Sequence, residues 1–155
     1  MIRVCICGGG SLAHVCAGVL SSHSEVEVNI FTRQPERWSH HLIVTDHEGK
    51  VYKGELNVIS NKPQEAMRDC NIIFFCLPGF AIESTLKSIK PYIENAVIGS
   101  IVCSTGFFFA SHKIQGEKLG CLGSSGCHSL QGLQIMAMQQ IYLGTNLKFL
   151  LLLRT

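Results

Sequence analysis

Residues 2–13 read Ile-Arg-Val-Cys-Ile-Cys-Gly-Gly-Gly-Ser-Leu-Ala, and this stretch decides the fold. Its first half, 2–7, is almost entirely apolar, which is typical of a central parallel strand that is buried on both faces. Three glycines follow, and Ser11 is placed to cap a helix. Apolar residues then recur at helical spacing, at Leu12, Val15, Cys16, Val19 and Leu20. The chain is therefore expected to open with a strand, a glycine turn and a helix.

Strands and helices continue to alternate along the chain. Buried strands are expected at 26–30, 72–76 and 97–103, and helices at 63–68 and 82–89. A hairpin is expected over residues 42–58, an insertion after the second strand in which 42–45 and 50–52 flank a turn at 46–49. This alternation predicts an α/β fold, a doubly wound parallel sheet of the Rossmann type.

The glycine turn carries the first functional signal. Residues 8–13, Gly8-Gly9-Gly10-Ser11-Leu12-Ala13, fit the pattern Gly-x-Gly-x-x-Ala between a strand and a helix, which is the context that a dinucleotide-binding turn requires. Gly8 permits the tight turn, Gly10 lets a pyrophosphate approach the backbone, and Ala13 allows close packing of the helix. The helix N-terminus offers free amides and a positive dipole end. The alternative is a glycine turn that binds nothing.

The end of the second strand bears on the choice of cofactor. An Asp or Glu there would select NAD through the ribose 2′-hydroxyl, but this chain has Phe31-Thr32-Arg33. Arg33 can stack on adenine or pair with a 2′-phosphate, which tilts the expectation modestly from NAD toward NADP. A solvated surface arginine is the other interpretation. His14 is expected in the core, at the surface or facing the cleft, and is assigned no catalytic role.

Composition limits the remaining function classes. The chain has 155 residues, of which 46% are hydrophobic and 15% charged, with a net charge of +2. That is enough for one domain with a core, and it leaves no electrostatic footprint for nucleic acid. No apolar run approaches a membrane span, and no signal peptide opens the chain, so we expect a cytoplasmic protein. The eight cysteines include no Cys-x-x-Cys pair, so we expect reduced thiols and no metal site.

Four segments, in order and spacing, resemble the opine dehydrogenases, the octopine and nopaline dehydrogenase family. They are residues 4–10 with 13–14, 32–33 with 36–38, 76–81 with 91–93, and 104–107. The resemblance covers about residues 1–118. More distant similarity extends to the glycerol-3-phosphate and ketopantoate type dehydrogenases, which share the glycine-rich turn and the strand that ends at Pro78.

The resemblance implies a nicotinamide-binding domain over residues 1–120. It places Thr32, Leu77, Pro78, Phe80 and Ser104 beside the cofactor, at the ends of the strands. The family's reaction is the reductive condensation of an amino acid with a 2-oxo acid. A helical C-terminal domain supplies the histidine and aspartate that handle the proton. No residue here matches that pair, so the resemblance implies a truncated and inactive fragment without its substrate domain.

Residues 121–155 are out of character with the rest of the chain. They contain Lys148, Arg154 and no acidic residue, and they end in an apolar run at 149–153. Codons chosen for 125–147 can be read one base out of phase as a polar-balanced peptide that resembles the opine dehydrogenases after this point. We therefore expect an irregular tail from a frameshift near Leu122. A genuine divergent or alternatively spliced tail is the other interpretation.

Three functions remain open at this point. The first is the NAD(P)-binding domain of an opine dehydrogenase-like oxidoreductase. The second is a stand-alone dinucleotide-binding or sensing module without catalysis. The third is a small reductase related to the glycerol-3-phosphate and ketopantoate dehydrogenases, although about 120 consistent residues leave little to enclose a substrate.

Overall fold

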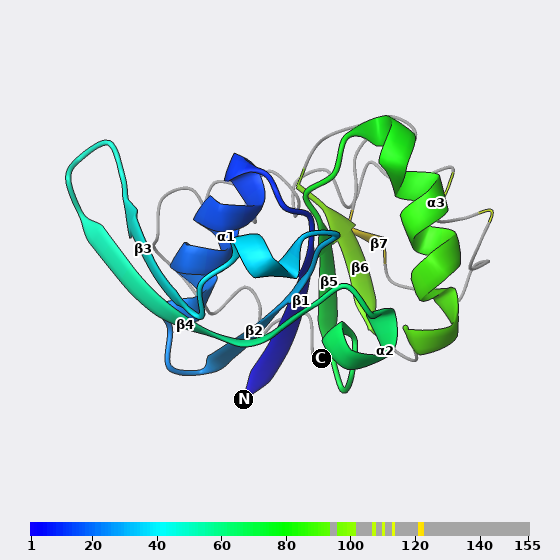
Figure 1. The fold of residues 1–155 in the computed structure, drawn as a ribbon, viewed down its shortest axis with the longest axis horizontal. Coiled ribbons are helices and arrows are strands. Elements are labelled where there is room, and N and C mark those ends of the chain that lie inside the picture. The colour runs from blue at the N-terminus through cyan, green and yellow to red at the C-terminus, as the bar shows by residue number, and fades with distance from the viewer. Residues whose placement is uncertain (94–95, 102–106, 108–109, 111–112, 114–120, 123–155) are drawn as a thin grey trace.

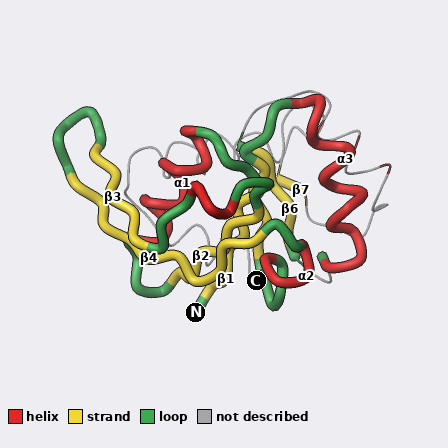
Figure 2. Tube along the Cα trace, viewed as in Figure 1, coloured by secondary structure: helices red, strands yellow, loops and turns green. Residues whose placement is uncertain are grey.

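The computed structural model describes residues 1–93, 96–101, 107, 110, 113 and 121–122. Its strands are β1 Ile2–Cys7, β2 Val26–Phe31, β3 His41–Thr45, β4 Val51–Ser60, β5 Ile72–Phe75, β6 Val97–Ser100 and β7 Cys121–Leu122. Its helices are α1 Ser11–Ser21, α2 Pro63–Ala66 and α3 Gly79–Ile89, with short 3₁₀ turns η1 Pro35–Arg37 and η2 Lys90–Tyr92. Figure 2 shows how these helices flank the strands.

Seven strands form one sheet in the order β3-β4-β2-β1-β5-β6-β7 (Figure 1). All neighbours pair in parallel except β3 and β4, which form an antiparallel hairpin. Without β3, this is the strand order of a Rossmann domain, and the order reverses between β1 and β5. The predicted α/β fold with a doubly wound sheet is confirmed.

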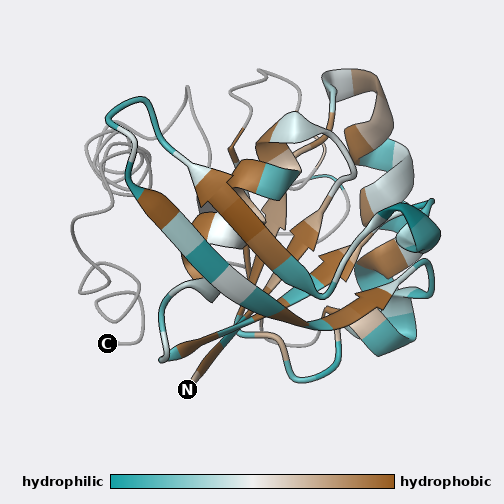
Figure 3. Cartoon of the chain, turned by 60° about the vertical axis from the view of Figure 1, so that its left-hand side comes forward, coloured by the Kyte–Doolittle hydropathy of each residue, from teal (hydrophilic) through white to brown (hydrophobic). Residues whose placement is uncertain are grey.

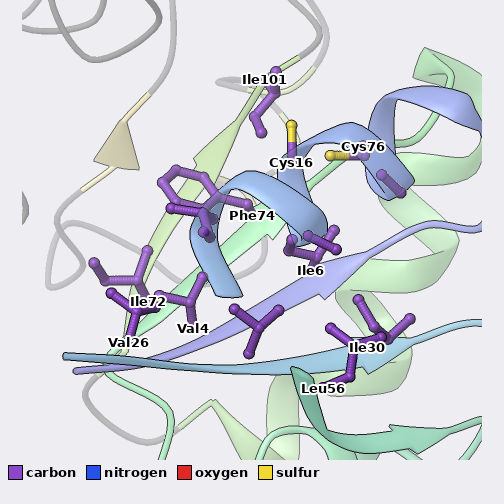
Figure 4. Close-up of a cluster of buried hydrophobic side chains, with 14 of the residues drawn as sticks. Val4, Ile6, Cys16, Val26, Ile30, Leu56, Ile72, Phe74, Cys76 and Ile101 are labelled. Atoms are coloured by element: carbon purple, nitrogen blue, oxygen red, sulfur yellow. The ribbon is translucent and has the colours of Figure 1, made fainter. Parts of the chain in front are cut away.

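The central strand β1 is buried on both faces, as its apolar run predicts. Ile2, Val4 and Ile6 pack in the cluster under α1, which Figure 4 shows, while Cys5 and Cys7 pack in the cluster under α3. Apolar residues are concentrated along the sheet in Figure 3, and hydrophilic ones in the turns. Fully burying side chains of this kind stabilises a fold by about 1.5–3 kcal/mol each.

One charged side chain interrupts β1, at the end of the sheet away from the glycine turn. The guanidinium of Arg3 pairs with the carboxylate of Glu27 at 2.6 Å and with that of Asp69 at 3.3 Å. The hydrogen bond to Glu27 raises the pKa of Arg3. These ion pairs tie β1 to β2 and to the turn before β5.

Helix α1 begins one residue earlier than a cap at Ser11 requires, so that expectation is wrong. Gly10 is the N-cap residue, with extended backbone angles φ −92° and ψ −177°, and Ser11 is the first helical residue. Among the described residues, no side chain caps this end. The first amides of any helix have no intrahelical acceptor, and here no capping side chain of the described residues replaces it.

The hairpin is confirmed, but its second arm does more than the sequence indicated. Strand β4 runs from Val51 to Ser60, two residues past the expected hairpin. Its second half, from Leu56 onward, pairs in parallel with β2, which the sequence did not indicate. Lys53, Glu55 and Asn57 alternate with less exposed residues, so no continuous apolar run reveals this strand. The hairpin is thus part of the sheet rather than a separate insertion.

Small residues let α1 lie directly on this hairpin. A Cβ atom built at Gly18 of α1 would collide with the side chain of Val44 in β3. A Cβ at Gly54 of β4 would collide with Ser21 at the end of α1. The helix and the hairpin can approach this closely only because both positions lack a side chain.

Replacing Gly18 by Val is expected to force α1 and β3 apart. Overpacking of this kind lowers the free energy of unfolding by about 1–3 kcal/mol. Urea denaturation followed by circular dichroism measures the change. Val15→Ala, at a 47% exposed position of the same helix, is the control and is expected to change stability by only about 0.5 kcal/mol. Equal effects of the two substitutions would contradict the packing argument.

The C-terminal part of the chain is described only in part. Residues 121–122, expected at the start of the irregular tail, pair in parallel with β6. Residues 123–155 and Ser104 lie outside the described residues, as do the last residues of the strand expected at 97–103. The five cysteines that the structure describes in full are free thiols: Cys5, Cys7, Cys16, Cys70 and Cys76.

Candidate functional site

A cleft of about 700 Å³ opens where the carboxyl ends of β1, β2 and β5 meet. This is the point at which the strand order reverses, where open α/β sheets bind their ligands. The cleft is lined by Gly8, Gly9, Gly10, Phe31, Thr32, Arg33, Gln34, Arg37, Trp38, Cys76, Leu77, Pro78, Phe80, Ala81, Ser84 and Thr85. Three loops therefore build it: the glycine turn, the segment after β2 and the start of α3.

Gly8 is required by the fold itself. Its φ of +155° is one that side-chain-bearing residues rarely adopt, and a Cβ there would lie 2.7 Å from the carbonyl oxygen of Cys76. The backbone N–H of Cys76 donates to the carbonyl of Cys7 at 2.8 Å, which holds the ends of β1 and β5 together. The glycine thus lets two strand ends meet at the floor of the cleft.

Gly10 has a different reason to be glycine. Its backbone angles suit any residue, and a Cβ built there meets no atom within 4 Å. Nothing in the described fold therefore excludes a side chain at this position. The open space lies at the mouth of the cleft, where a side chain would fill the room that a ligand needs to reach the backbone. Gly9 is constrained less than Gly8 and more than Gly10, because a Cβ there would lie 2.8 Å from the side-chain hydroxyl of Thr32.

Two helices begin at the cleft. The first amides of α1 have no capping side chain among the described residues, and α3 starts at Gly79, directly after Pro78. Unpaired amides at a helix N-terminus, together with the helix dipole, favour a bound anion. Phe80, in the first turn of α3, is 88% exposed and offers an aromatic face to the opening.

The segment after β2 makes the opposite wall positive. Arg33 is exposed and forms no hydrogen bond or ion pair with any residue that the structure describes. Within the described residues, the guanidinium of Arg37 has one hydrogen bond, to the side-chain oxygen of Gln34 at 3.1 Å. Thr32 is buried, and its backbone N–H donates to Ser60 at 3.1 Å. No carboxylate belongs to the lining residues described, so the wall suits a polyanion.

The floor of the cleft adds no negative charge. The thiol of Cys76 shares a hydrogen bond with the thiol of Cys16, and this bond, followed by burial, raises the pKa of Cys76. Figure 4 shows the two side chains next to each other, between α1 and the end of β5. Cys76 is therefore a neutral thiol at neutral pH, and it does not repel an anion.

His14 and Trp38 form a stacked pair beside the glycine turn. Their ring centroids are 3.7 Å apart and the ring planes differ by 10°. The imidazole Nδ1 also lies 3.0 Å from the carbonyl oxygen of Gly10. The sequence left the place of His14 open, and the structure puts it between the glycine turn and the segment after β2.

The structure brings most of the predicted site residues together. Those that line the cleft are Gly8, Gly9, Gly10, Thr32, Arg33, Leu77, Pro78 and Phe80. Ser11 is exposed at the start of α1, and Ala13 is fully buried in the core, in the packing role predicted for it. Leu12 instead lines a second cavity of about 260 Å³ between α1 and the hairpin. Ser104 lies outside the described residues.

Sequence reasoning missed the part of the site that depends on tertiary contact. Gln34, Arg37, Trp38, Cys76, Ala81, Ser84 and Thr85 also line the cleft. The spacing of Ala81, Ser84 and Thr85 is one available signal, because residues at i, i+3 and i+4 share a helix face. Trp38 is the only tryptophan in the chain, a second signal that the sequence offered.

Two further observations concern the described part of the chain. Its histidine, cysteine and acidic side chains are nowhere grouped in threes as a metal ion requires. None of its helices is both long and apolar enough to cross a membrane.

The sheet order, the glycine turn and the cleft at the strand switch define a Rossmann-type dinucleotide-binding domain. The family model of ketopantoate reductase PanE/ApbA matches residues 4–104. The chain belongs to this family, which consists of NAD(P)-dependent dehydrogenases.

The resemblance to the opine dehydrogenases is confirmed by individual relatives. The chain is 34% identical over 133 residues to opine dehydrogenase of Haliotis discus hannai, which covers 76% of this chain and 33% of the relative. It is 29% identical over 142 residues to octopine dehydrogenase of Pecten maximus, covering 83% and 36%. The chain thus spans about a third of the length of the curated relatives it matches.

Solved structures agree with the sequence comparison. A structure of octopine dehydrogenase with NADH and L-arginine superposes with a TM-score of 0.69 at 30% identity, over 76% of this chain and 32% of that one. A ketopantoate reductase from Ralstonia eutropha superposes with a TM-score of 0.62 at 15% identity, over 77% and 40%. The second likeness shows the fold alone.

Gly10 and Gly8 provide a matched test of the cleft. Gly10→Val is expected to abolish dinucleotide binding in calorimetry while costing about 1 kcal/mol of stability, through weaker helix capping. Gly8→Val is expected to unfold or strongly destabilise the protein, because the side chain collides with backbone at a strained φ. Unchanged binding in a folded Gly10→Val protein would rule out the glycine turn as the phosphate site.

Proposed function

We propose that this chain binds a nicotinamide dinucleotide in the cleft, as the cofactor-binding domain of an opine dehydrogenase-like oxidoreductase. The observation that carries the proposal is the open space at Gly10, because no atom of the described fold excludes a side chain there and a bound pyrophosphate would. The domain comprises residues 1–120, and residues 121–122 extend its sheet.

Different parts of the cleft hold different parts of the dinucleotide. The turn Gly8–Gly10 and the first amides of α1, from Ser11 to Ala13, hold the pyrophosphate. Thr32 and Arg33 face the adenosine ribose. The far side of the cleft, with Leu77, Pro78 and Phe80, borders the nicotinamide. Ser104, which lies outside the described residues, is assigned to the same site by the resemblance alone. When bound, the nicotinamide ring carries the hydride of the reaction.

The reaction is proposed from the relatives. Octopine dehydrogenase has been solved with NADH and L-arginine and with NADH and pyruvate, an amino acid and a 2-oxo acid. We propose the same substrate classes, joined by reductive condensation, for a full-length protein in which this chain is the cofactor-binding domain. The described cleft lining contains no histidine and no carboxylate, so it offers no group that handles the proton at neutral pH.

A stand-alone dinucleotide-binding or sensing module is the second candidate. Two features of the cleft favour it. The walls proposed for the phosphates and the ribose are built within this chain, and the described lining contains no histidine or carboxylate to handle a proton. The downstream coding DNA, read in all frames, separates the two candidates, since an oxidoreductase requires a substrate domain encoded in one of those frames.

Arg33 is expected to tune the choice of cofactor. Arg33→Ala removes an unpaired cation from the wall that faces the ribose, and a charge-assisted hydrogen bond of about 1.5–3 kcal/mol corresponds to roughly 10- to 150-fold in affinity. NADP binding is expected to weaken by that factor and NAD binding by much less, as measured by calorimetry. Arg68→Ala, an exposed arginine outside the cleft lining, is the control. Equal losses of NAD and NADP would show that Arg33 does not discriminate between them.

The chain of 155 residues is expected to show no dehydrogenase activity. Hydride transfer needs a substrate held against the nicotinamide and a positioned acid or base, and the described cleft offers neither. A purified, monodisperse sample is expected to bind NADH or NADPH without oxidising it in the presence of L-arginine and pyruvate, followed at 340 nm. Sustained oxidation that disappears on deletion of residues 121–155 would overturn the proposal of a cofactor half without catalysis.

A further inference from the structure

We propose that His14 is a positioning residue, which aims the N–H of Ser11 at the phosphate site and is itself held in place by Trp38. The inference rests on the proposed dinucleotide site. It assigns a role to two residues that are outside the glycine motif, one of them in the first turn of α1 and the other 24 positions along the chain.

The carbonyl of Gly10 accepts two hydrogen bonds from the same residue. The backbone N–H of His14 donates at 3.1 Å, as in any helix, and the imidazole Nδ1 lies 3.0 Å away. A carbonyl oxygen can only accept, so the ring donates through Nδ1–H and the tautomer is fixed. Two donors from one turn of α1 therefore hold this carbonyl along the helix axis.

Fixing the carbonyl also fixes the amide on the other side of the peptide bond. The peptide between Gly10 and Ser11 is planar and trans, so its C=O and N–H point in opposite directions. With the oxygen held toward the helix, the N–H of Ser11 points away from α1. The Cβ position of the adjacent Gly10 is open, so a ligand can approach this amide. Glycine alone would leave this peptide freer to rotate, because it tolerates many backbone angles.

Trp38 fixes the imidazole in the orientation that this bond needs. The two rings stack at 3.7 Å with planes 10° apart, and Trp38 is only 8% exposed. Its backbone N–H donates to the carbonyl of Pro35 at 3.1 Å, which anchors it to η1. Trp38 also lines the cleft. The stack therefore connects the glycine turn to the segment that carries Thr32 and Arg33.

Two substitutions separate the hydrogen bond from the stack. His14→Phe keeps an aromatic ring against Trp38 and removes the donor. His14→Asn removes the ring and keeps an N–H donor the same number of bonds from the backbone as Nδ1. The three residue types have similar helix propensities, so α1 itself is not biased. His23→Phe, just past the end of α1, is the matched control.

The ligands are ADP, which has a pyrophosphate, and adenosine, which does not. For the full chain, His14→Phe is expected to weaken ADP roughly 3- to 10-fold, the range for one lost hydrogen bond, and to leave adenosine unchanged. His14→Asn, which keeps the donor but loses the stack, is expected to bind ADP more tightly than His14→Phe and less tightly than the wild type, and His23→Phe to change neither ligand. ¹⁵N chemical shifts of the wild-type imidazole are expected to show Nδ1 protonated and Nε2 not.

Each outcome decides one claim. Wild-type protein that binds neither ADP nor NADH would refute the proposed function and the role of His14 with it. Wild-type binding that His14→Phe leaves intact would overturn the positioning role alone. Equal losses for ADP and adenosine, or no rescue by His14→Asn, would show that His14 supports the structure without aiming the amide. An imidazole without a proton on Nδ1 would contradict the hydrogen bond directly.

Discussion

The approach of Gly8 to Cys76 is the contact on which the rest of the site depends. It brings the ends of β1 and β5 together where the strand order reverses, with 2.7 Å between the carbonyl oxygen of Cys76 and the place a Cβ would take. Because no side chain separates the strand ends, the glycine turn and the start of α3 border one cleft. A larger residue would push the two loops apart, and with them the two helix N-termini.

This contact is held in place by a sheet that is buried on both sides. The residues of β1 divide between the cluster under α1 and the cluster under α3. On the α1 side, the hairpin packs on the helix through Gly18 and Gly54, so α1 contacts the central strands on one side and the hairpin on another. A helix packed on two sides cannot easily tilt, and its N-terminus keeps its direction toward the cleft.

The sequence predicted the parts of the fold that depend on local pattern. The strand at 2–7, the glycine turn and the helix after it are all short-range signals, and all three are found. The pairing of β4 with β2 was not predicted, because the polar residues Lys53, Glu55 and Asn57 alternate along β4 and leave no continuous apolar run. Residue preference predicted the N-cap at Ser11, whereas the N-cap is Gly10 and Ser11 is already the first residue of the helix.

For the site too, the features that depend on local pattern were predictable and those that depend on tertiary contact were not. Gly8 to Gly10 and the ends of β2 and β5 could be predicted, because a parallel sheet brings the carboxyl ends of its strands to one edge. The contact between His14 and Trp38 could not, since 24 residues separate them and neither belongs to the motif. Arg37 reaches the cleft only because η1 turns the chain back toward α1.

The three glycines of the turn show why a motif and its function need separate arguments. Gly8 is constrained by backbone angle and a neighbouring strand, and Gly9 by the hydroxyl of Thr32, so the fold accounts for both. Gly10 is constrained by neither, and its backbone angles suit any residue. A tight turn alone gives the third glycine only the modest preference that an N-cap position has for this residue. Its place beside two helix N-termini, and beside an arginine without a partner among the described residues, fits the proposed anionic ligand.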